Sequence, residues 1–340
     1  MAAVPTPTRD SAPASVSHRI GLLQREFTAV LGADTVRSLH AESWTLDLLA
    51  TLVPPAAFAC VFVLLGRPDL GAPATAGLVL LNGWLLTLVG LVAHDLGTHR
   101  RRYGRTGSWL HGALAWGLLT VAGTAYTRAH VRHHARLGGP DDPEAYKARL
   151  DTPAKRWCFA TLPGFLYFTR RAQADGSHAY LDIPASDAPA LRRRAVERVV
   201  VWAWVAGFAA WAALVDWKQV LLAYGVPVLV VAPALNAIRI VFEHADADDA
   251  NPYWIGTHYR CGWITRALVL ADSGDCHLVH HVFPKIPFYR CPQASRLMRA
   301  HFARTGVPER TSFWGLLRGW FVDGHAHRSA WPGGGGASSA

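Results

Sequence analysis

Hydrophobic residues along this chain gather in a few long runs, with polar residues concentrated between them. A helix needs about 20 residues to cross the hydrocarbon core of a bilayer, and four runs reach that length. They cover residues 46–66, 73–93, 198–217 and 219–241. Apolar runs at 157–168 and 262–271 are too short to span. The pattern predicts an all-α integral membrane protein with about four transmembrane helices.

Three short boxes of histidines lie beside these runs. The first contains His94 and His99, and the other two follow the pattern H-x2-H-H at residues 130–134 and 277–281. Positions i, i+3 and i+4 share one face of a helix, so the histidines of each later box are predicted to point at one locus. His94 and His99 can serve the same site if the helix ends or distorts near Gly97.

Imidazole is the commonest metal-ligating side chain near neutral pH, so the boxes indicate a metal site. One ion takes roughly four to six ligands, and the eight clustered histidines therefore predict two ions. His244 is a ninth candidate because it ends the last predicted span at the height of the boxes. The sequence contains neither H-E-x-x-H nor Glu-x-x-His, which excludes the usual zinc protease and the soluble di-iron bundle.

A fifth apolar run at 108–126 lies between the first and second boxes. If both boxes bind one metal centre, a single crossing between them would place them on opposite sides of the membrane. This run is therefore predicted to lie along the interface or to dip in and return. Arginines at 100–102, 105 and 192–194 flank the spans on the side of the boxes. The positive-inside rule then predicts an inner-membrane protein whose boxes lie in a cytoplasmic helical cap.

Composition supports the membrane interpretation. Charged residues make up 17% of the chain, against about 25% in soluble domains, and the net charge of +10 fits basic cytoplasmic loops. No nucleic-acid motif is present, so no nucleic-acid partner is expected. The five cysteines lack C-x-x-C spacing, which excludes the usual iron–sulfur patterns and predicts free thiols, with Cys276 as a packing residue.

The chain is expected to form one folded domain between two polar ends. Residues 1–40 are polar and predicted to be partly disordered, residues 41–322 form the membrane domain, and residues 323–340 form a flexible tail. The first 45 residues hold no apolar stretch of the kind found in a cleavable secretory signal.

The three boxes together resemble those of the integral-membrane fatty acid desaturase and hydroxylase superfamily, and the resemblance runs from about Trp44 to about Arg318. The run Val282–Arg290 after the third box is similar to the H-H-x-F-P-x-I-P-x-Y segment typical of lipid desaturases. The resemblance implies two irons held by histidines, with O2 as co-substrate. The implied ligands are His94, His99, His130, His133, His134, His244, His277, His280 and His281.

Charged residues beside these histidines are candidates for orienting them. Asp95 can accept the far ring N–H of a ligand histidine and fix its tautomer. Arg239 and Glu243 resemble an R-x-x-x-E-H pattern of bacterial members of the superfamily. Asp275 is a candidate for the same supporting role, although capping the helix of the third box is equally natural.

An acidic group after the second box has two interpretations. It can orient ligands or pair with nearby arginines, and a solvated acidic loop is nearly as well supported. Its members are Asp141, Asp142 and Glu144.

The resemblance predicts a membrane di-iron oxidase that uses O2 and external electrons to desaturate a fatty acyl chain. The sequence has no fused heme domain, flavin fingerprint or iron–sulfur spacing, so an external donor such as a ferredoxin and its reductase is expected. Hydroxylation, ketolation or alkene-forming decarboxylation on the same centre are the alternatives. A membrane metal-binding or transport protein is less favoured, because transport ligands usually lie within the spans near the midplane.

Overall fold

The computed structural model describes residues 16–137, 142–144, 149–171, 183–244, 261–269, 276–305 and 313–323. Within these ranges every regular element is a helix, and no strand is present. The predicted all-α class is therefore confirmed.

Four helices in the described part of the chain are long and apolar enough to cross a membrane, which confirms the predicted number. Three of them are α3 (Trp44–Leu64), α4 (Ala72–Val92) and α9 (Ala188–Leu214). The fourth is a continuous helical run whose segments are α10 (Trp217–Val220), η4 (Leu221–Gly225), η5 (Pro227–Val231) and α11 (Ala232–His244). The turns η4 and η5 are π-helical, and Pro227 is the first residue of η5.

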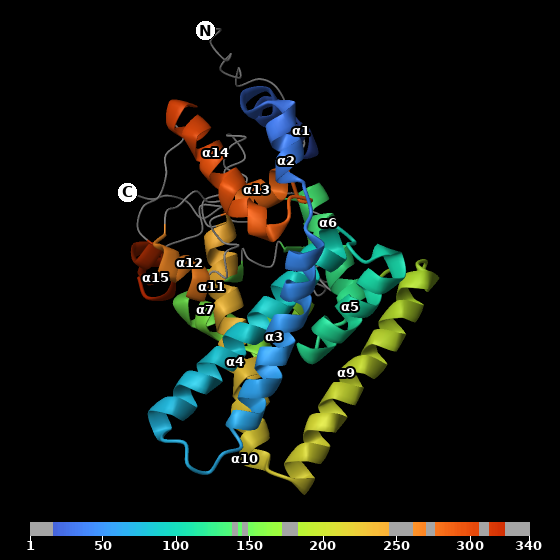
Figure 1. Cartoon of the computed structure of the whole chain (residues 1–340), viewed down its shortest axis with the longest axis vertical. Coiled ribbons are helices and arrows are strands. Elements are labelled where there is room, and N and C mark those ends of the chain that lie inside the picture. The colour runs from blue at the N-terminus through green and yellow to red at the C-terminus, as the bar shows by residue number, and fades with distance from the viewer. Residues whose placement is uncertain are drawn as a thin grey trace.

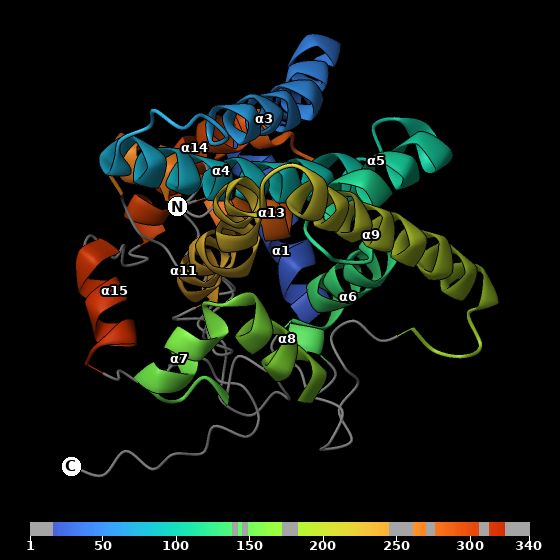
Figure 2. The same cartoon turned by 90° about the horizontal axis from the view of Figure 1, so that it is seen from below.

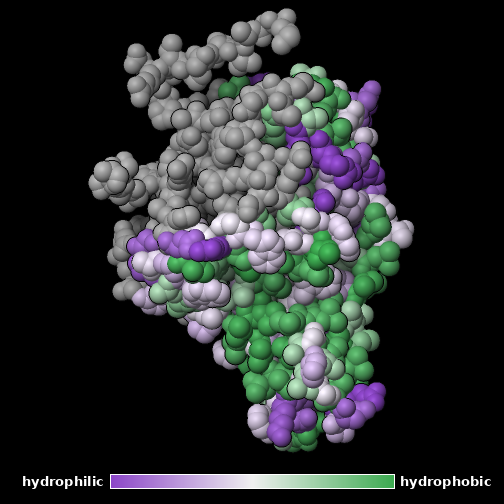
Figure 3. Space-filling model, turned by 90° about the vertical axis from the view of Figure 1, so that its left-hand side faces the viewer, coloured by the Kyte–Doolittle hydropathy of each residue, from purple (hydrophilic) through white to green (hydrophobic). Residues whose placement is uncertain are grey.

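The spanning helices present apolar side chains outward. Figure 3 shows an apolar surface over the lower half of the molecule, bounded by hydrophilic residues at the lower tip and above. On other faces too the spanning helices expose large apolar residues, among them Val199, Trp202 and Leu214 of α9. An exposed apolar surface of this extent is stable in contact with lipid tails.

The fifth apolar run does not form one spanning helix. It divides into α5 (Gly104–Leu118) and α6 (Gly123–Arg136), and neither is among the candidate spans. Thr120 between them has a φ of 62°, and the bonds Thr120 N–Gly117 O (2.9 Å) and Val121 N–Trp116 O (2.8 Å) complete a Schellman stop. The helix therefore ends between the first two boxes and the chain turns back. This is what a metal centre shared by both boxes requires.

Helices from both ends of the described chain pack together above the spans (Figure 1). They are α1 (Val16–Leu31), α2 (Ala33–Leu39), α13 (His277–Val282) and α14 (Cys291–Thr305). Leu23 and Phe27 of α1 are fully buried against α13 and α14, and the Gln24 side chain donates to the Val282 carbonyl at 2.6 Å. The helices α1 and α2 therefore pack against the helices that follow the spans, and the domain division at residue 40 stays a prediction.

Four more described helices lie around the end of α11. They are α7 (Pro153–Phe159), α8 (Leu162–Arg171), α12 (Trp263–Leu268) and α15 (Phe313–Phe321). The short helix η8 (Phe288–Arg290) instead contacts α14. In the view from below, α7, α8 and α15 lie on the side of α11 away from α3 (Figure 2). The helix α11 thus runs from the spanning layer into this group.

The cytoplasmic location of the boxes is a prediction that cysteine labelling tests. Arg105 and Arg136 are exposed on either side of the α5–α6 turn. Single cysteines at these positions, in a background without the exposed Cys60 and Cys158, should both react only from the cytoplasmic side. Labelling of the two sites from opposite sides would contradict the topology and the shared metal centre together.

Candidate metal centre

The first box lies in a π-helical turn, η1 (Ala93–His99), which continues α4. A π turn forms i to i+5 bonds, seen here in Arg100 N donating to the Asp95 carbonyl at 3.1 Å. The Nε2 atoms of His94 and His99 are consequently 3.1 Å apart. The condition for a shared site, a distortion of the helix near Gly97, is therefore met, and this distortion brings both histidines of the box together.

Five imidazoles from all three boxes converge through their Nε2 atoms. The Nε2 separations are 2.8 Å for His94–His130, 2.9 Å for His130–His134 and 2.9 Å for His134–His280. His130 and His280 are 3.3 Å apart, and His99 joins through His94. We call these residues the five-histidine cluster.

The geometry of this cluster fits a metal ion. Ligand nitrogens about 2.1 Å from an ion and at right angles to one another lie about 3 Å apart, close to the separations observed. Four members (His94, His99, His130 and His280) offer nitrogens that all lie within 4.8 Å of one another. Burial holds the pKa of His130, His134 and His280 well below the usual range, so these imidazoles are in the neutral form that binds metals.

The other three box histidines form a second group beside the first. The Nε2 atoms of His277 and His281 are 2.9 Å apart, and the His133 ring centroid lies 5.3 Å from that of His281. The His281 ring stacks on His134 with centroids 4.2 Å apart, which joins the two groups. We call His133, His277 and His281 the three-histidine cluster.

This division corrects the expectation that each later box points at one locus. One turn of a helix holds about 3.6 residues, so the adjacent positions i+3 and i+4 point about 100° apart. The second box therefore sends His130 and His134 to one cluster and His133 to the other. The third box likewise separates His280 from His277 and His281.

Carboxylates surround the three-histidine cluster. The Asp142 oxygens lie 2.9 and 3.0 Å from Nδ1 of His133, and Glu144 Oε2 lies 3.6 Å from its Nε2. Glu243 Oε1 lies 3.7 Å from Nδ1 of His277 and 3.2 Å from Arg239 Nε. Asp142 and Glu144 therefore both lie beside His133. This supports the interpretation that the acidic group orients ligands over that of a solvated acidic loop.

Replacing Asp142 with Asn should weaken metal binding about 10- to 100-fold, because a carboxylate that accepts from a ligand histidine fixes its tautomer and direction. Competition with a chelator measures this affinity. Asp151→Asn is the control, since this aspartate pairs with Lys155 at the surface. Equal affinities in the two variants would contradict the orienting role of Asp142.

Asp95 pairs with Arg100 rather than with an imidazole. Arg100 donates from Nε and Nη2 to Asp95 Oδ2 at 2.9 and 2.7 Å, and from Nη2 to Asp47 Oδ1 at 2.6 Å. All three side chains are buried. Burial lowers the pKa of Arg100, but the hydrogen bonds and charges of the two carboxylates outweigh it and raise the pKa above its usual value. This network fixes the end of η1 that carries His99.

Three candidate residues fall wholly or partly outside what the structure describes. Asp141 and Asp275 lie outside the described residues. His244 is the last residue of α11, but its side chain is not among those described, so its role as a ligand stays a prediction. Asp47 was missed by the sequence reasoning, and its only sequence signal is a carboxylate in the first turn of an apolar helix.

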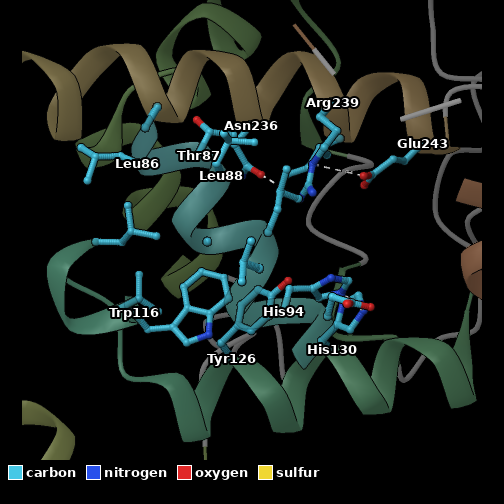
Figure 4. Close-up of a pocket in the computed structure, with 18 of the residues that line it drawn as sticks. Leu86, Thr87, Leu88, His94, Trp116, Tyr126, His130, Asn236, Arg239 and Glu243 are labelled. Carbon is cyan, nitrogen blue, oxygen red and sulfur yellow. Dashed lines mark hydrogen bonds and ion pairs between the residues drawn. The ribbon is translucent and has the colours of Figure 1, made fainter. Parts of the chain in front are cut away.

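A cavity of about 210 Å³ extends from the spanning helices to the five-histidine cluster. Its apolar residues include Leu86, Leu88, Leu91, Trp116, Leu119 and Val228. His94, His130 and His280 line the other end, and Figure 4 shows His94 and His130 beside Tyr126 across the cavity from α11. An apolar ligand in this cavity reaches the candidate metal site without crossing bulk water.

These features define a helical membrane protein with a buried histidine cluster that can bind metal. The model of the fatty acid desaturase family matches residues 71–313, so the chain belongs to that family. The predicted resemblance is thereby confirmed.

The chain is also similar to curated plant proteins at low identity. It is 26% identical over 202 residues to a chloroplastic omega-3 fatty acid desaturase of Glycine max, covering 52% of this chain and 43% of the relative. It is 24% identical over 248 residues to a probable fatty acid desaturase of Sorghum bicolor, covering 65% and 61%. A Delta(12) acyl-lipid conjugase of Momordica charantia is 26% identical over 280 residues, covering 70% and 67%. The chain thus spans less than half the length of the first relative.

Proposed function

We propose that this protein is a membrane oxidoreductase that uses O2 and external electrons to desaturate a fatty acyl chain. The observation that carries the proposal is a cluster of five imidazoles at the end of an apolar cavity between spanning helices. Membership of the fatty acid desaturase family supports the same reaction class.

The two histidine clusters would hold two iron ions. Bound iron would supply the O2-dependent oxidation of an unactivated C–H bond. His94, His99, His130, His134 and His280 would serve one ion, and His133, His277 and His281 the other, with His244 as the ninth predicted ligand. Asp142 and Glu243 would direct the imidazoles of His133 and His277.

The apolar wall of the cavity would bind the acyl chain and exclude water. Leu86, Trp116 and Val228 provide apolar contact, and burial of a methylene group is worth about 0.8 kcal/mol. A site closed to bulk water protects a strong oxidant from side reactions.

Electrons would come from a separate protein such as a ferredoxin with its reductase. We place the protein in the inner membrane with the site facing the cytoplasm, on the basis of the basic residues beside the boxes. Hydroxylation, ketolation or alkene-forming decarboxylation on the same centre are the alternatives. One of the matched relatives is named a conjugase, so the similar proteins do not all bear the same reaction name.

Turnover of the purified, iron-loaded protein with isotopically labelled O2, a reductant and an electron carrier tests the proposal. Mass spectrometry should find a product two hydrogens lighter than the substrate and without label. Label in the product would instead indicate hydroxylation or ketolation, and loss of the carboxyl carbon as CO2 would indicate alkene formation. Full activity in protein that holds stoichiometric zinc and no iron would reject iron chemistry.

A further inference from the structure

Arg239 is the one cation among the described residues that line the cavity, apart from the histidines. It lies on α11, and its side chain is only 14% exposed. The apolar residues of the cavity are unfavourable surroundings for a charge, so the guanidinium needs hydrogen-bond partners there.

The structure gives Arg239 partners for only part of its guanidinium. Nη2 donates to Asn236 Oδ1 at 3.0 Å, and Nε lies 3.2 Å from Glu243 Oε1. A guanidinium carries five N–H donors, and no residue of the described chain accepts from Nη1. Arg239 therefore has donors left for a ligand in the cavity.

Arg239 lies across the cavity from the histidines. Figure 4 shows Asn236, Arg239 and Glu243 on one wall, with His94, His130 and Tyr126 on the wall across from them. One Glu243 oxygen lies within 3.7 Å of both the Arg239 guanidinium and the His277 ring. A group bound to Nη1 consequently lies close to the candidate metal centre.

We propose that Arg239 binds the carboxylate of a free fatty acid whose tail lies along the apolar part of the cavity. A carboxylate matches the planar donors of a guanidinium in both charge and shape. An esterified chain has no charge to offer and would bury these donors against methylene groups. This inference rests on the proposed function for the reaction itself, and it places the carbons next to the carboxylate nearest the histidines.

Binding of dodecanoic acid and of its methyl ester to the full-length protein in nanodiscs tests the inference. Both would be measured by displacement of a fluorescent fatty acid, at a pH where the carboxyl group is ionised. A hydrogen bond to a charged group predicts that the acid binds about 10- to 100-fold more tightly than the ester. Arg239→Gln should remove this difference while leaving ester binding nearly unchanged, and Arg239→Lys should keep part of it.

Arg128→Gln is the matched control, because this arginine pairs with Asp187 at the surface away from the cavity. It should retain the preference for the acid. Equal binding of acid and ester by the wild-type protein would overturn the inference without any variant. Equal weakening of both ligands by Arg239→Gln would also overturn it, since that result would reduce Arg239 to a support for Glu243.

The two proposals fail differently. If the protein oxidises acyl chains of thioesters or phospholipids but shows no preference for the free acid, the Arg239 inference is wrong and the proposed function stands. If it prefers the acid through Arg239 but forms no oxidised product when iron-loaded and reduced, the proposed function is wrong and the binding site stands.

Discussion

Replacing His280 with alanine should reduce product formation to background and lower the metal content per chain. His280 is the only residue of α13 in the five-histidine cluster, and its Nε2 lies 2.9 Å from that of His134 and 3.3 Å from that of His130. Truncation removes one ligand from the ion that the other four would hold. Elemental analysis of the purified protein and a product assay with an electron carrier measure the two effects.

His40→Ala is the control for this change. His40 lies in the same group of helices above the spans, but its ring contacts the Val36 carbonyl at 2.8 Å and not the cluster. The His40 variant should keep the wild-type metal content. Both variants should remain folded in detergent, since neither change touches the spanning helices. A His280 variant with full metal content and full activity would remove this residue from the site.

The spanning helices were predictable from the sequence because lipid requires long uninterrupted apolar runs. The composition of the run 108–126 resembles that of a span. Its break was therefore predictable only from the requirement that the first two boxes share one metal centre. The structure explains the break by the left-handed Thr120 and the bonds around it, which no apolar pattern reveals. The need for both boxes to meet at one site therefore predicted a turn that the residue propensities of this run did not.

The histidine boxes predicted a shared site but not how it is divided. The spacing of His130, His133 and His134 fixes them near one another, whereas their assignment to two clusters depends on the angle at which α6 meets α13. The same limit applies to Asp142, whose contact with His133 joins α6 to a short segment after it. Such contacts come from tertiary packing, so a local pattern can supply only the candidates.

Asp95 shows that neighbourhood in the sequence does not determine a contact. It follows His94 directly, but the π turn directs its Oδ2 to Arg100. Asp47 then binds the same guanidinium from α3, 53 residues away. A buried cation next to the site attracts the nearest carboxylates, and this competition cannot be read from the boxes alone.

Replacing Asp47 with Asn should destabilise the protein by about 3–5 kcal/mol, the range found when one partner of a buried ion pair is removed. Asp47 is fully buried and contacts both Arg100 (2.6 Å) and Arg102 (2.7 Å), so the change leaves buried positive charge with less compensation. Thermal unfolding in detergent measures the loss. Product formation should also fall. Arg100 directly follows η1, so loss of its ion pair with Asp47 loosens the turn that carries His99.

Glu42→Gln separates the buried pair from the general effect of removing an acid. Glu42 contacts the same two arginines, but its side chain is 33% exposed, and exposed pairs contribute about 0–1 kcal/mol. This variant should unfold within a few degrees of the wild type and keep its activity. If the Asp47 and Glu42 variants lose stability equally, burial of the Asp47–Arg100 pair does not determine how much stability is lost. The end of η1 must then be held by packing of its apolar neighbours, such as the fully buried Leu96.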